Sequence, residues 1–265
     1  MSESRLAERW RAVRAERRAA LIPYLPAGYP SPAAFVAAAA GAQAAGADLL
    51  EVGIPFSDPL ADGPVIQRAT HAALAQGVGA ARTLALIREA GLTIPVVVMT
   101  YLNPILAYGV DRFLADARAA GVAGLLLTDL PAGGDPALEA RVAGGPLAFI
   151  RLVAPTTPAA RMAQAVERAS GFVYLISRLG VTGVTAGVPA DLGDHVARVR
   201  AATTLPVAVG FGIGTAAQAR ATARLADGVV VGSALVETLG RDGVPGLERL
   251  VRELAAGVRG GGRAA

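Results

Sequence analysis

Residues Leu49–Pro64 read LLEVGIPFSDPLADGP, an apolar run that passes into a turn rich in proline and glycine. The apolar run encloses one acid, Glu51, and the turn carries another, Asp62. A short run of this kind, bounded by turn residues, is typical of a strand buried on both faces. The stretch therefore predicts a buried strand that leads into a loop, with an acid on each.

The two acids are predicted to lie in contrasting environments. Glu51 is surrounded by apolar neighbours, so we expect burial to raise its pKa and keep it protonated enough to act as a general acid. Asp62 lies between Pro59 and Gly63, a setting that we expect to expose it to water or substrate. Such a difference allows two carboxylates of one site to divide acid and base work.

The same strand pattern recurs along the chain. Short β-branched or leucine-rich runs predict eight strands, at Leu21–Leu25, Asp48–Val52, Ile94–Met99, Gly124–Leu127, Ala148–Val153, Phe172–Ile176, Pro206–Val209 and Gly228–Val231. Alanine-rich stretches between them predict helices, such as Pro32–Ala45, Asp111–Ala120, Pro158–Ala169 and Asp191–Ala202. Apolar strands that alternate with helices form a parallel sheet, and eight such units close as a TIM (β/α)8 barrel. An open doubly wound sheet is the alternative.

Length and the two ends complete the predicted architecture. A chain of 265 residues with 53% hydrophobic content suits a single barrel domain, expected over residues 1–258. Ser4–Arg18 places Leu6, Trp10 and Val13 at helical spacing, which predicts an extra N-terminal helix across the N-terminal mouth of the barrel. Residues 259–265, RGGGRAA, are expected to form a flexible tail.

The composition excludes several kinds of chemistry. The chain has no lysine, so it can neither form a Schiff base nor anchor pyridoxal phosphate covalently. It has no cysteine, which excludes a thiolate nucleophile and a disulfide. Its two histidines, His71 and His195, are far apart and lack the spacing of a zinc site, so we expect no metal. Catalysis is left to carboxylates, hydroxyls and backbone groups.

Charge and hydropathy bear on partners and location. The formal charge is only +4, with the basic content spread along the chain, which argues against a nucleic-acid partner. No apolar run is long enough to cross a membrane, and the first residues, MSESRLAERW, lack the apolar core of a signal peptide. A soluble, cytoplasmic protein is expected.

Glycine-rich turns follow the last two predicted strands. Gly210–Thr215 and Gly232–Ser233 occupy the positions at which TIM barrels often bind a phosphate through backbone N–H groups. A third glycine-rich segment, Ser177–Pro189, follows the sixth strand and is expected to be an active-site lid. Together they predict a phosphorylated ligand at the carboxyl ends of the strands.

Several segments taken together resemble a known family, the α subunit of tryptophan synthase. The resemblance covers essentially the whole chain and is carried by LIPYLPAGYP, LLEVGIPFSDPLADGP, Tyr101-Leu102-Asn103-Pro104, Thr128-Asp129-Leu130-Pro131, YLISRLGVTG, GFGIG and VVGSALV. It implies retro-aldol cleavage of indole-3-glycerol phosphate to indole and glyceraldehyde 3-phosphate. It also implies a β-subunit partner in an α2β2 complex, with pyridoxal phosphate only on that partner and no cofactor on this chain.

The chemistry of the two acids agrees with this activity. Glu51 can protonate C3 of the indole ring and, once ionised, take the proton from the side-chain hydroxyl as it becomes an aldehyde. Asp62 can accept the ring N–H and stabilise the cation. The indole ring then serves as the electron sink, so no metal or cofactor is needed.

Matching the family motifs assigns further residues to the site. The resemblance implies contacts with the substrate or its phosphate by Tyr24, Leu126, Tyr174, Thr182, Gly183, Phe211, Gly212, Gly232 and Ser233. For Tyr24, Leu126 and Tyr174, packing in the barrel core is the alternative. The resemblance also places Thr182 as a latch that reaches Asp62 when the lid closes.

The partner-contacting surface is implied in the same way. It comprises Pro55, Phe56, Ser57, Asp58, Pro59, Asn103, Asp129 and Pro131. Three positions depart from the family pattern, with Tyr24 in place of a common phenylalanine, Pro26 in place of threonine and Gly214 in place of serine. Two other functions stay open: a stand-alone lyase that releases free indole, and a barrel that binds a phosphorylated metabolite without converting it.

Overall fold

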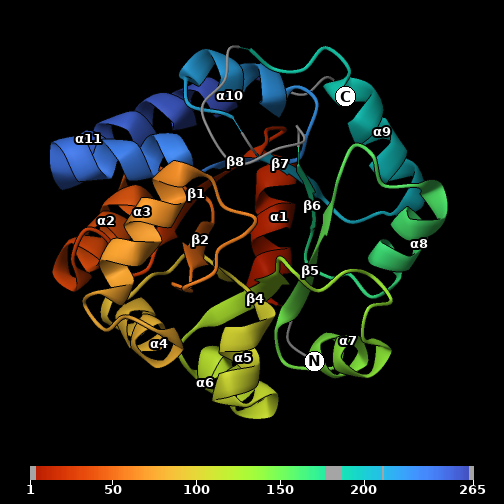
Figure 1. Cartoon of the computed structure of the whole chain (residues 1–265). Helices are drawn as coiled ribbons and strands as arrows, with labels where there is room; N and C mark the ends of the chain where they lie inside the picture. Colours follow the sequence, from red (N-terminus) through yellow and green to blue (C-terminus); the bar gives the residue numbers. More distant parts are fainter. Residues whose placement is uncertain (1–3, 177–186, 211, 263–265) are drawn as a thin grey trace.

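Eight parallel strands form a closed barrel in the computed structural model, which describes residues 4–176, 187–210 and 212–262 (Figure 1). The strands are β1 (Ala20–Pro26), β2 (Leu50–Gly53), β3 (Val96–Thr100), β4 (Val122–Leu127), β5 (Ala148–Val153), β6 (Val173–Ile176), β7 (Val207–Gly210) and β8 (Gly228–Val231). β1 pairs with β2 on one side and with β8 on the other, which closes the ring. The predicted TIM barrel is confirmed, and the open doubly wound alternative is wrong.

Each predicted strand is present, with both ends within two residues of the expected position. The strands are almost entirely buried, because the barrel interior covers one face and the surrounding helices cover the other. Continuous apolar runs, rather than alternating ones, are what such strands require.

Helices surround the barrel in Figure 1. They are α2 (Pro32–Ala44), α3 (Pro64–Leu74), α4 (Ala80–Glu89), α5 (Leu102–Tyr108), α6 (Val110–Ala119), α7 (Pro136–Ala143), α8 (Ala159–Glu167), α9 (Leu192–Ala202), α10 (Ala216–Ala223) and α11 (Ser233–Arg259). The four helices named from the sequence correspond to α2, α6, α8 and α9. Within the described part of the chain, no helix is long and apolar enough to cross a membrane.

Helix α1 (Arg5–Ala15) closes the N-terminal end of the barrel. Its apolar side buries Leu6, Trp10 and Val13 in one cluster with residues that line the barrel interior. The Trp10 ring lies edge-on to the ring of Phe172, with centroids 5.5 Å apart. In Figure 1 this helix appears in the middle of the ring of strands. The predicted helix across the N-terminal mouth is thus confirmed.

Helix α11 is the largest element that the sequence analysis did not predict. It consists of two helical parts that meet at Gly243, whose φ of 67° and ψ of −166° interrupt the helical backbone, and Pro245 follows. Glycine and proline usually mark turns, so their presence at this junction interrupts the sequence pattern of a long helix. The helix continues to Arg259, one residue past the expected end of the barrel, and Gly261 is buried beyond it.

A largely buried ion pair links the end of α1 to the start of β2 at the N-terminal face of the barrel. Arg18, which follows α1, donates to both carboxylate oxygens of Asp48 at 2.7 and 2.8 Å. Asp48, just before β2, also accepts from the backbone N–H of Leu21 in β1 at 3.0 Å. Because a buried charge that loses its partner is costly, this pair fixes where the two strands begin.

We predict that Asp48→Ala destabilises the fold by about 2 kcal/mol, because it leaves the Leu21 N–H without an acceptor and the Arg18 guanidinium with only Glu16 and the Ala19 carbonyl. Urea unfolding followed by circular dichroism measures the change. The matched control is Asp111→Ala, which removes the acceptor of an Arg141 pair that is exposed to solvent. We expect no measurable change there, and equal effects of the two variants would contradict this account.

Candidate active site

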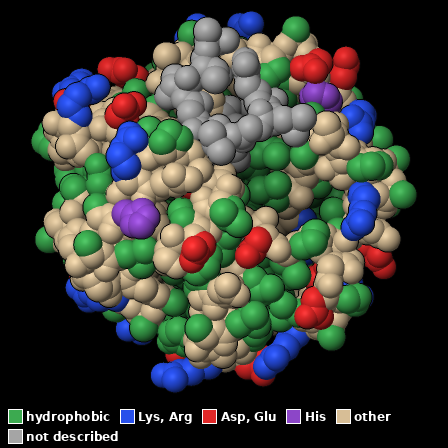
Figure 2. Space-filling model, viewed as in Figure 1, with side chains coloured by type: hydrophobic (Ala, Val, Ile, Leu, Met, Phe, Trp, Pro, Cys, Tyr) green, Lys and Arg blue, Asp and Glu red, His purple; other side chains and the backbone are tan. Residues whose placement is uncertain are grey.

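The candidate site lies at the carboxyl ends of the strands, where Figure 2 shows hydrophobic side chains around a central hollow. Glu51 projects from β2 and is paired in register with Tyr24 of β1. Asp62 comes from the loop between β2 and α3. Both acids are buried, with 2% of Glu51 and 6% of Asp62 exposed. The chain therefore brings two carboxyl groups together in a desolvated place.

Burial dominates the electrostatics of Glu51. It raises the pKa of this carboxyl to about 8, with a further contribution from the negative charge of Asp62. Within the described part of the chain, Glu51 Oε1 is buried without a hydrogen-bond partner. The prediction of a buried glutamic acid that keeps its proton near neutral pH is confirmed.

The expectation that water reaches Asp62 was wrong, because only 6% of the residue is exposed. The loop folds inward, and burial raises the pKa of Asp62 to about 6. The hydroxyl of Tyr101 donates to Asp62 Oδ2 at 3.2 Å, which opposes that rise because it stabilises the ionised form. A turn with proline and glycine looks solvent-exposed in sequence, but here the barrel mouth lies beneath it.

Tyr101 is a site residue that the sequence analysis quoted but did not assign. It directly follows β3, and its hydroxyl accepts from the backbone N–H of Ala61 at 2.9 Å while it donates to Asp62. Its ring packs on Phe56, with centroids 5.3 Å apart. Its position could have indicated a role in the site, because residues at the carboxyl ends of barrel strands commonly form the active site.

Two further tyrosines reach the same place. Tyr24 and Tyr174 are buried, and burial followed by the charges of the two acids raises both pKa values well above the ordinary range. Each hydroxyl occupies space left by a glycine at the end of the next strand, Gly53 for Tyr24 and Gly210 for Tyr174. Leu126 lies in the interior cluster with Tyr174, a position compatible both with packing and with substrate contact.

The turn after β8 has the features of an anion site. Gly232 is the N-cap residue of α11 and makes no side-chain cap, and Ser233 is the first helical residue. The first N–H groups of a helix lack intrahelical acceptors and favour negative charge. A side chain at Gly232 would contact the Tyr24 ring at 3.5 Å, so this turn adjoins the site of the two acids.

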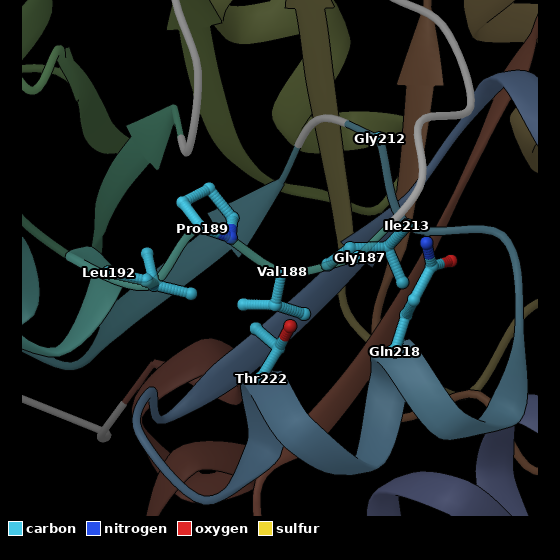
Figure 3. Close-up of a pocket in the computed structure, with 8 residues that line it drawn as sticks. All are labelled: Gly187, Val188, Pro189, Leu192, Gly212, Ile213, Gln218 and Thr222. Atoms are coloured by element: carbon cyan, nitrogen blue, oxygen red, sulfur yellow. The ribbon is translucent and has the colours of Figure 1, made fainter.

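The turn after β7 is held by Gln218 of α10. Its Oε1 accepts from the backbone N–H groups of Gly214 at 2.9 Å and Thr215 at 3.1 Å. Figure 3 shows Gln218 reaching from α10 to the turn that carries Gly212 and Ile213, beside a small cavity. The backbone N–H groups of Gly214 and Thr215 are therefore already paired within the turn.

The predicted partner surface is only partly exposed. In the loop after β2, Ser57 and Asp58 are exposed and Phe56 is half-buried, whereas Pro55 and Pro59 are buried. The two buried prolines stabilise the conformation of the loop and are not available for contact with a partner.

Helix α5 and the loop after β4 also contribute to that surface. Asn103, Asp129 and Pro131 are exposed. Asp129 also caps α5, because its Oδ1 accepts from the backbone N–H of Leu102 at 2.7 Å.

Two exposed apolar side chains near these residues were missed from the sequence. Leu60, in the loop after β2, is 87% exposed, and Leu106, on α5, is 50% exposed. They are the exposed large hydrophobic residues of the described part of the chain. In sequence each looks like an ordinary core leucine, so only the structure reveals them.

Some expected site residues lie outside the described residues: Thr182, Gly183, Phe211 and most of the predicted lid. Of the two histidines, His71 is exposed and His195 lies 3.7 Å from Asp191 of the same helical turn. Among residues 4–176, 187–210 and 212–262, no group of three or more His, Asp or Glu side chains could hold a metal ion.

Comparison with known proteins identifies the family. The family model described as tryptophan synthase alpha chain matches residues 10–259. The alpha chain of Gluconacetobacter diazotrophicus is 48% identical over 263 residues, 96% of each chain. That of a Caulobacter strain is 49% identical over 245 residues, 90% of this chain and 88% of the relative.

Solved structures agree. A chain of Mycobacterium tuberculosis tryptophan synthase has a TM-score of 0.89 at 46% identity, covering 97% of this chain and 99% of that one. The alpha subunit from Legionella pneumophila has a TM-score of 0.89 at 34% identity with the same coverage. The chain thus belongs to the tryptophan synthase alpha chain family and is a carbon–carbon lyase.

Proposed function

We propose that Glu51 and Asp62 carry out the reaction of this family, cleavage of indole-3-glycerol phosphate to indole and glyceraldehyde 3-phosphate. The observation that carries the proposal is a pair of buried carboxyl groups with raised and different pKa values, about 8 for Glu51 and about 6 for Asp62. Near neutral pH one keeps its proton and the other is ionised, which is the division that this cleavage requires.

Glu51 acts first as the acid. It delivers its proton to C3 of the indole ring, and the bond from C3 to the glycerol phosphate chain can then break with its electrons flowing into the ring. The carboxylate that remains takes the proton of the adjacent side-chain hydroxyl, which becomes the aldehyde of glyceraldehyde 3-phosphate. One residue thus gives and recovers one proton in each turnover.

Asp62 acts as the counter-charge. Its carboxylate accepts the N–H of the indole ring and stabilises the positive charge that develops there after C3 is protonated. Tyr101 orients this carboxylate through the hydrogen bond to Oδ2. The ring serves as the electron sink, so we propose that this chain needs no cofactor of its own.

The remaining contacts are proposed from placement and from the family resemblance. Tyr24, Tyr174 and Leu126 would enclose the indole and its side chain, while Gly212, Gly232 and Ser233 would bind the phosphate. The same resemblance assigns Thr182, Gly183 and Phe211 to the site. A phosphate at the N-terminus of α11 would gain from the helix dipole.

We also propose a tryptophan synthase β subunit as partner, in an α2β2 complex in the cytoplasm, with pyridoxal phosphate on the β subunit. Leu60 and Leu106 support this proposal by their positions, because Leu60 directly follows the loop residues assigned to the partner surface and Leu106 lies one helical turn from Asn103 on α5. They favour a complex over a stand-alone lyase. The paired acids argue against a barrel that only binds a phosphorylated metabolite.

We predict that Glu51→Gln lowers the rate of indole formation by about a hundred- to ten-thousand-fold, because an amide can neither give nor take the proton. Indole release from indole-3-glycerol phosphate, followed with and without a β subunit, measures the effect. Glu89→Gln, on the exposed side of α4, is the control and should match the parent. A Glu51→Gln variant with a rate within a few fold of the parent would refute the mechanism.

Tyr101→Phe should move the acidic limb of the pH profile of kcat/KM upward from about pH 6. The hydroxyl now stabilises ionised Asp62, so its loss raises the pKa of that carboxyl, and the active ionised form is lost at higher pH as acid is added. Tyr108→Phe is the control, because the Tyr108 hydroxyl donates to Asp116 away from the site. An acidic limb that stays in place would show that Asp62 is not the group titrating there.

Leu106→Asp should weaken binding of the β subunit at least tenfold, because it places a charge in a proposed apolar contact. Isothermal titration calorimetry with purified β subunit measures the affinity. Ala217→Asp, on an exposed position of α10, is the matched control and should bind as the parent does. Equal affinity for the parent and Leu106→Asp would remove α5 from the interface.

A further inference from the structure

The hydroxyl of Tyr24 occupies a place prepared for it beside Glu51. Tyr24 of β1 and Glu51 of β2 are partners in register, so their side chains point into the barrel side by side. Gly53 is two residues beyond Glu51 and faces the same way. A Cβ at Gly53 would lie 2.2 Å from the Tyr24 hydroxyl oxygen, so the hydroxyl fits only because residue 53 has no side chain.

The Tyr24 ring spans the site from the phosphate turn to the acids. At its base, a side chain at Gly232 would lie 3.5 to 3.8 Å from the ring atoms and Cβ of Tyr24. At its tip, the hydroxyl lies over Gly53. The ring therefore holds the hydroxyl at a fixed distance from the strand that carries Glu51.

Glu51 needs a donor at one stage of the proposed reaction. After it gives its proton to the indole ring, it is a buried carboxylate, and Oε1 has no hydrogen-bond partner within the described part of the chain. A buried carboxylate oxygen that lacks a donor is costly. Among the described residues, Asp62, Tyr24 and Tyr174 act electrostatically with Glu51, and of these three the tyrosines carry a proton that can be donated.

The strand register singles out Tyr24 among these donors, although the charge of Glu51 is the first to act on Tyr174, whereas that of Asp62 precedes it for Tyr24. Tyr174 belongs to β6, on the opposite side of the barrel from β2, and its hydroxyl lies over Gly210 of β7. The hydroxyl of Tyr101 already donates to Asp62. Of the three tyrosines, only Tyr24 is on a strand adjacent to that of Glu51 and at the same level.

We propose that Tyr24 is a positioning residue whose hydroxyl donates a hydrogen bond to the Glu51 carboxylate between its two proton transfers. The inference rests on the proposed function of Glu51. The tyrosine keeps its proton throughout: the carboxyl proton goes to C3, the carboxylate accepts the tyrosine hydrogen bond, and the proton that restores the carboxyl comes from the substrate hydroxyl. Phenylalanine, the residue that the family pattern favours at this position, lacks this donor.

The test is Tyr24→Phe, which removes the hydroxyl and keeps the ring. A hydrogen bond to a charged group affects a rate by roughly ten- to a hundredfold, so kcat for indole release in the complex with a β subunit should fall by that factor while KM changes little. The alkaline limb of kcat/KM should move to higher pH. The hydroxyl favours ionised Glu51, so without it the active protonated form persists further into alkali.

Tyr29→Phe is the matched control. The Tyr29 hydroxyl fills the space beside Gly240 in the same way, because a Cβ at Gly240 would lie 2.2 Å from the Tyr29 hydroxyl oxygen. Gly240, however, belongs to α11 and not to the strand of Glu51. This variant should leave kcat and both limbs of the pH profile as in the parent. A loss equal to that of Tyr24→Phe would attribute the effect to general packing and overturn the inference.

Gly53→Ala provides a second, independent variant. Its new Cβ must displace the Tyr24 hydroxyl, so it should reproduce the slow rate and the shifted limb. In the Tyr24→Phe background the hydroxyl is already gone and the new Cβ meets only the ring, with Cζ at 2.8 Å, so the same alanine should cost less than in the parent. Strictly additive effects of the two changes on kcat would overturn the inference.

Glu51→Gln and Tyr24→Phe together separate this inference from the proposed function. If Glu51→Gln retains activity, the proposed mechanism fails whatever Tyr24 does. If Glu51→Gln is inactive while Tyr24→Phe matches the parent in kcat and in its alkaline limb, the role of Tyr24 alone is overturned.

Discussion

The rest of the structure depends on burying two carboxyl groups at one end of a barrel. Removal from water raises the pKa of both Glu51 and Asp62, and the charge of Asp62 raises that of Glu51 further. This arrangement destabilises the fold. Between the ordinary pKa of a glutamic acid, 4.5, and the folded value of about 8, the folded chain binds more protons than the unfolded chain, so stability falls as pH rises through that window. Burial of Glu51 therefore lowers the stability of the fold and keeps the carboxyl protonated near neutral pH.

The barrel can accommodate that cost because the remainder is well packed. Strand pairing closes the ring, α1 fills the N-terminal end with Trp10, and the Arg18–Asp48 pair fixes the starts of the strands. The opposite end is thereby left for chemistry. Glycines at the strand ends, such as Gly53 and Gly210, make room there for tyrosine hydroxyls among the acids. Rigid strands thus set distances that loops could not hold.

Much of the fold and part of the site could be predicted from the sequence. The apolar strands are short, regular and separated by helices, so their number and order follow from local pattern alone. Glu51 was identifiable because an acid within a buried strand has no ordinary structural reason to be there. The long helix α11 was not predicted, because Gly243 and Pro245 interrupt its sequence pattern. Residues of this helix are nevertheless buried on both sides of the interruption.

The missing features of the site all depend on contacts between distant segments. Asp62 is buried because its loop folds onto Tyr101, 39 residues away, and nothing local to either residue predicts that contact. Gln218 looks like a helix-surface residue until its Oε1 is found on the turn after β7. The exposure of Leu60 and Leu106 likewise follows from how loops lie on the barrel. Local patterns predict elements, whereas tertiary contacts decide how each side chain is used.

The most direct measurement of the central claim is the titration of the Glu51 carboxyl in the folded protein. Carbon-13 NMR of glutamate side-chain carboxyl carbons would follow it, with Glu51→Gln assigning the resonance by its disappearance. We predict a midpoint near pH 8, as expected for a carboxyl desolvated beside Asp62. A midpoint near 4.5, the ordinary value for glutamic acid, would contradict the claim, because Glu51 would then lack its proton at neutral pH.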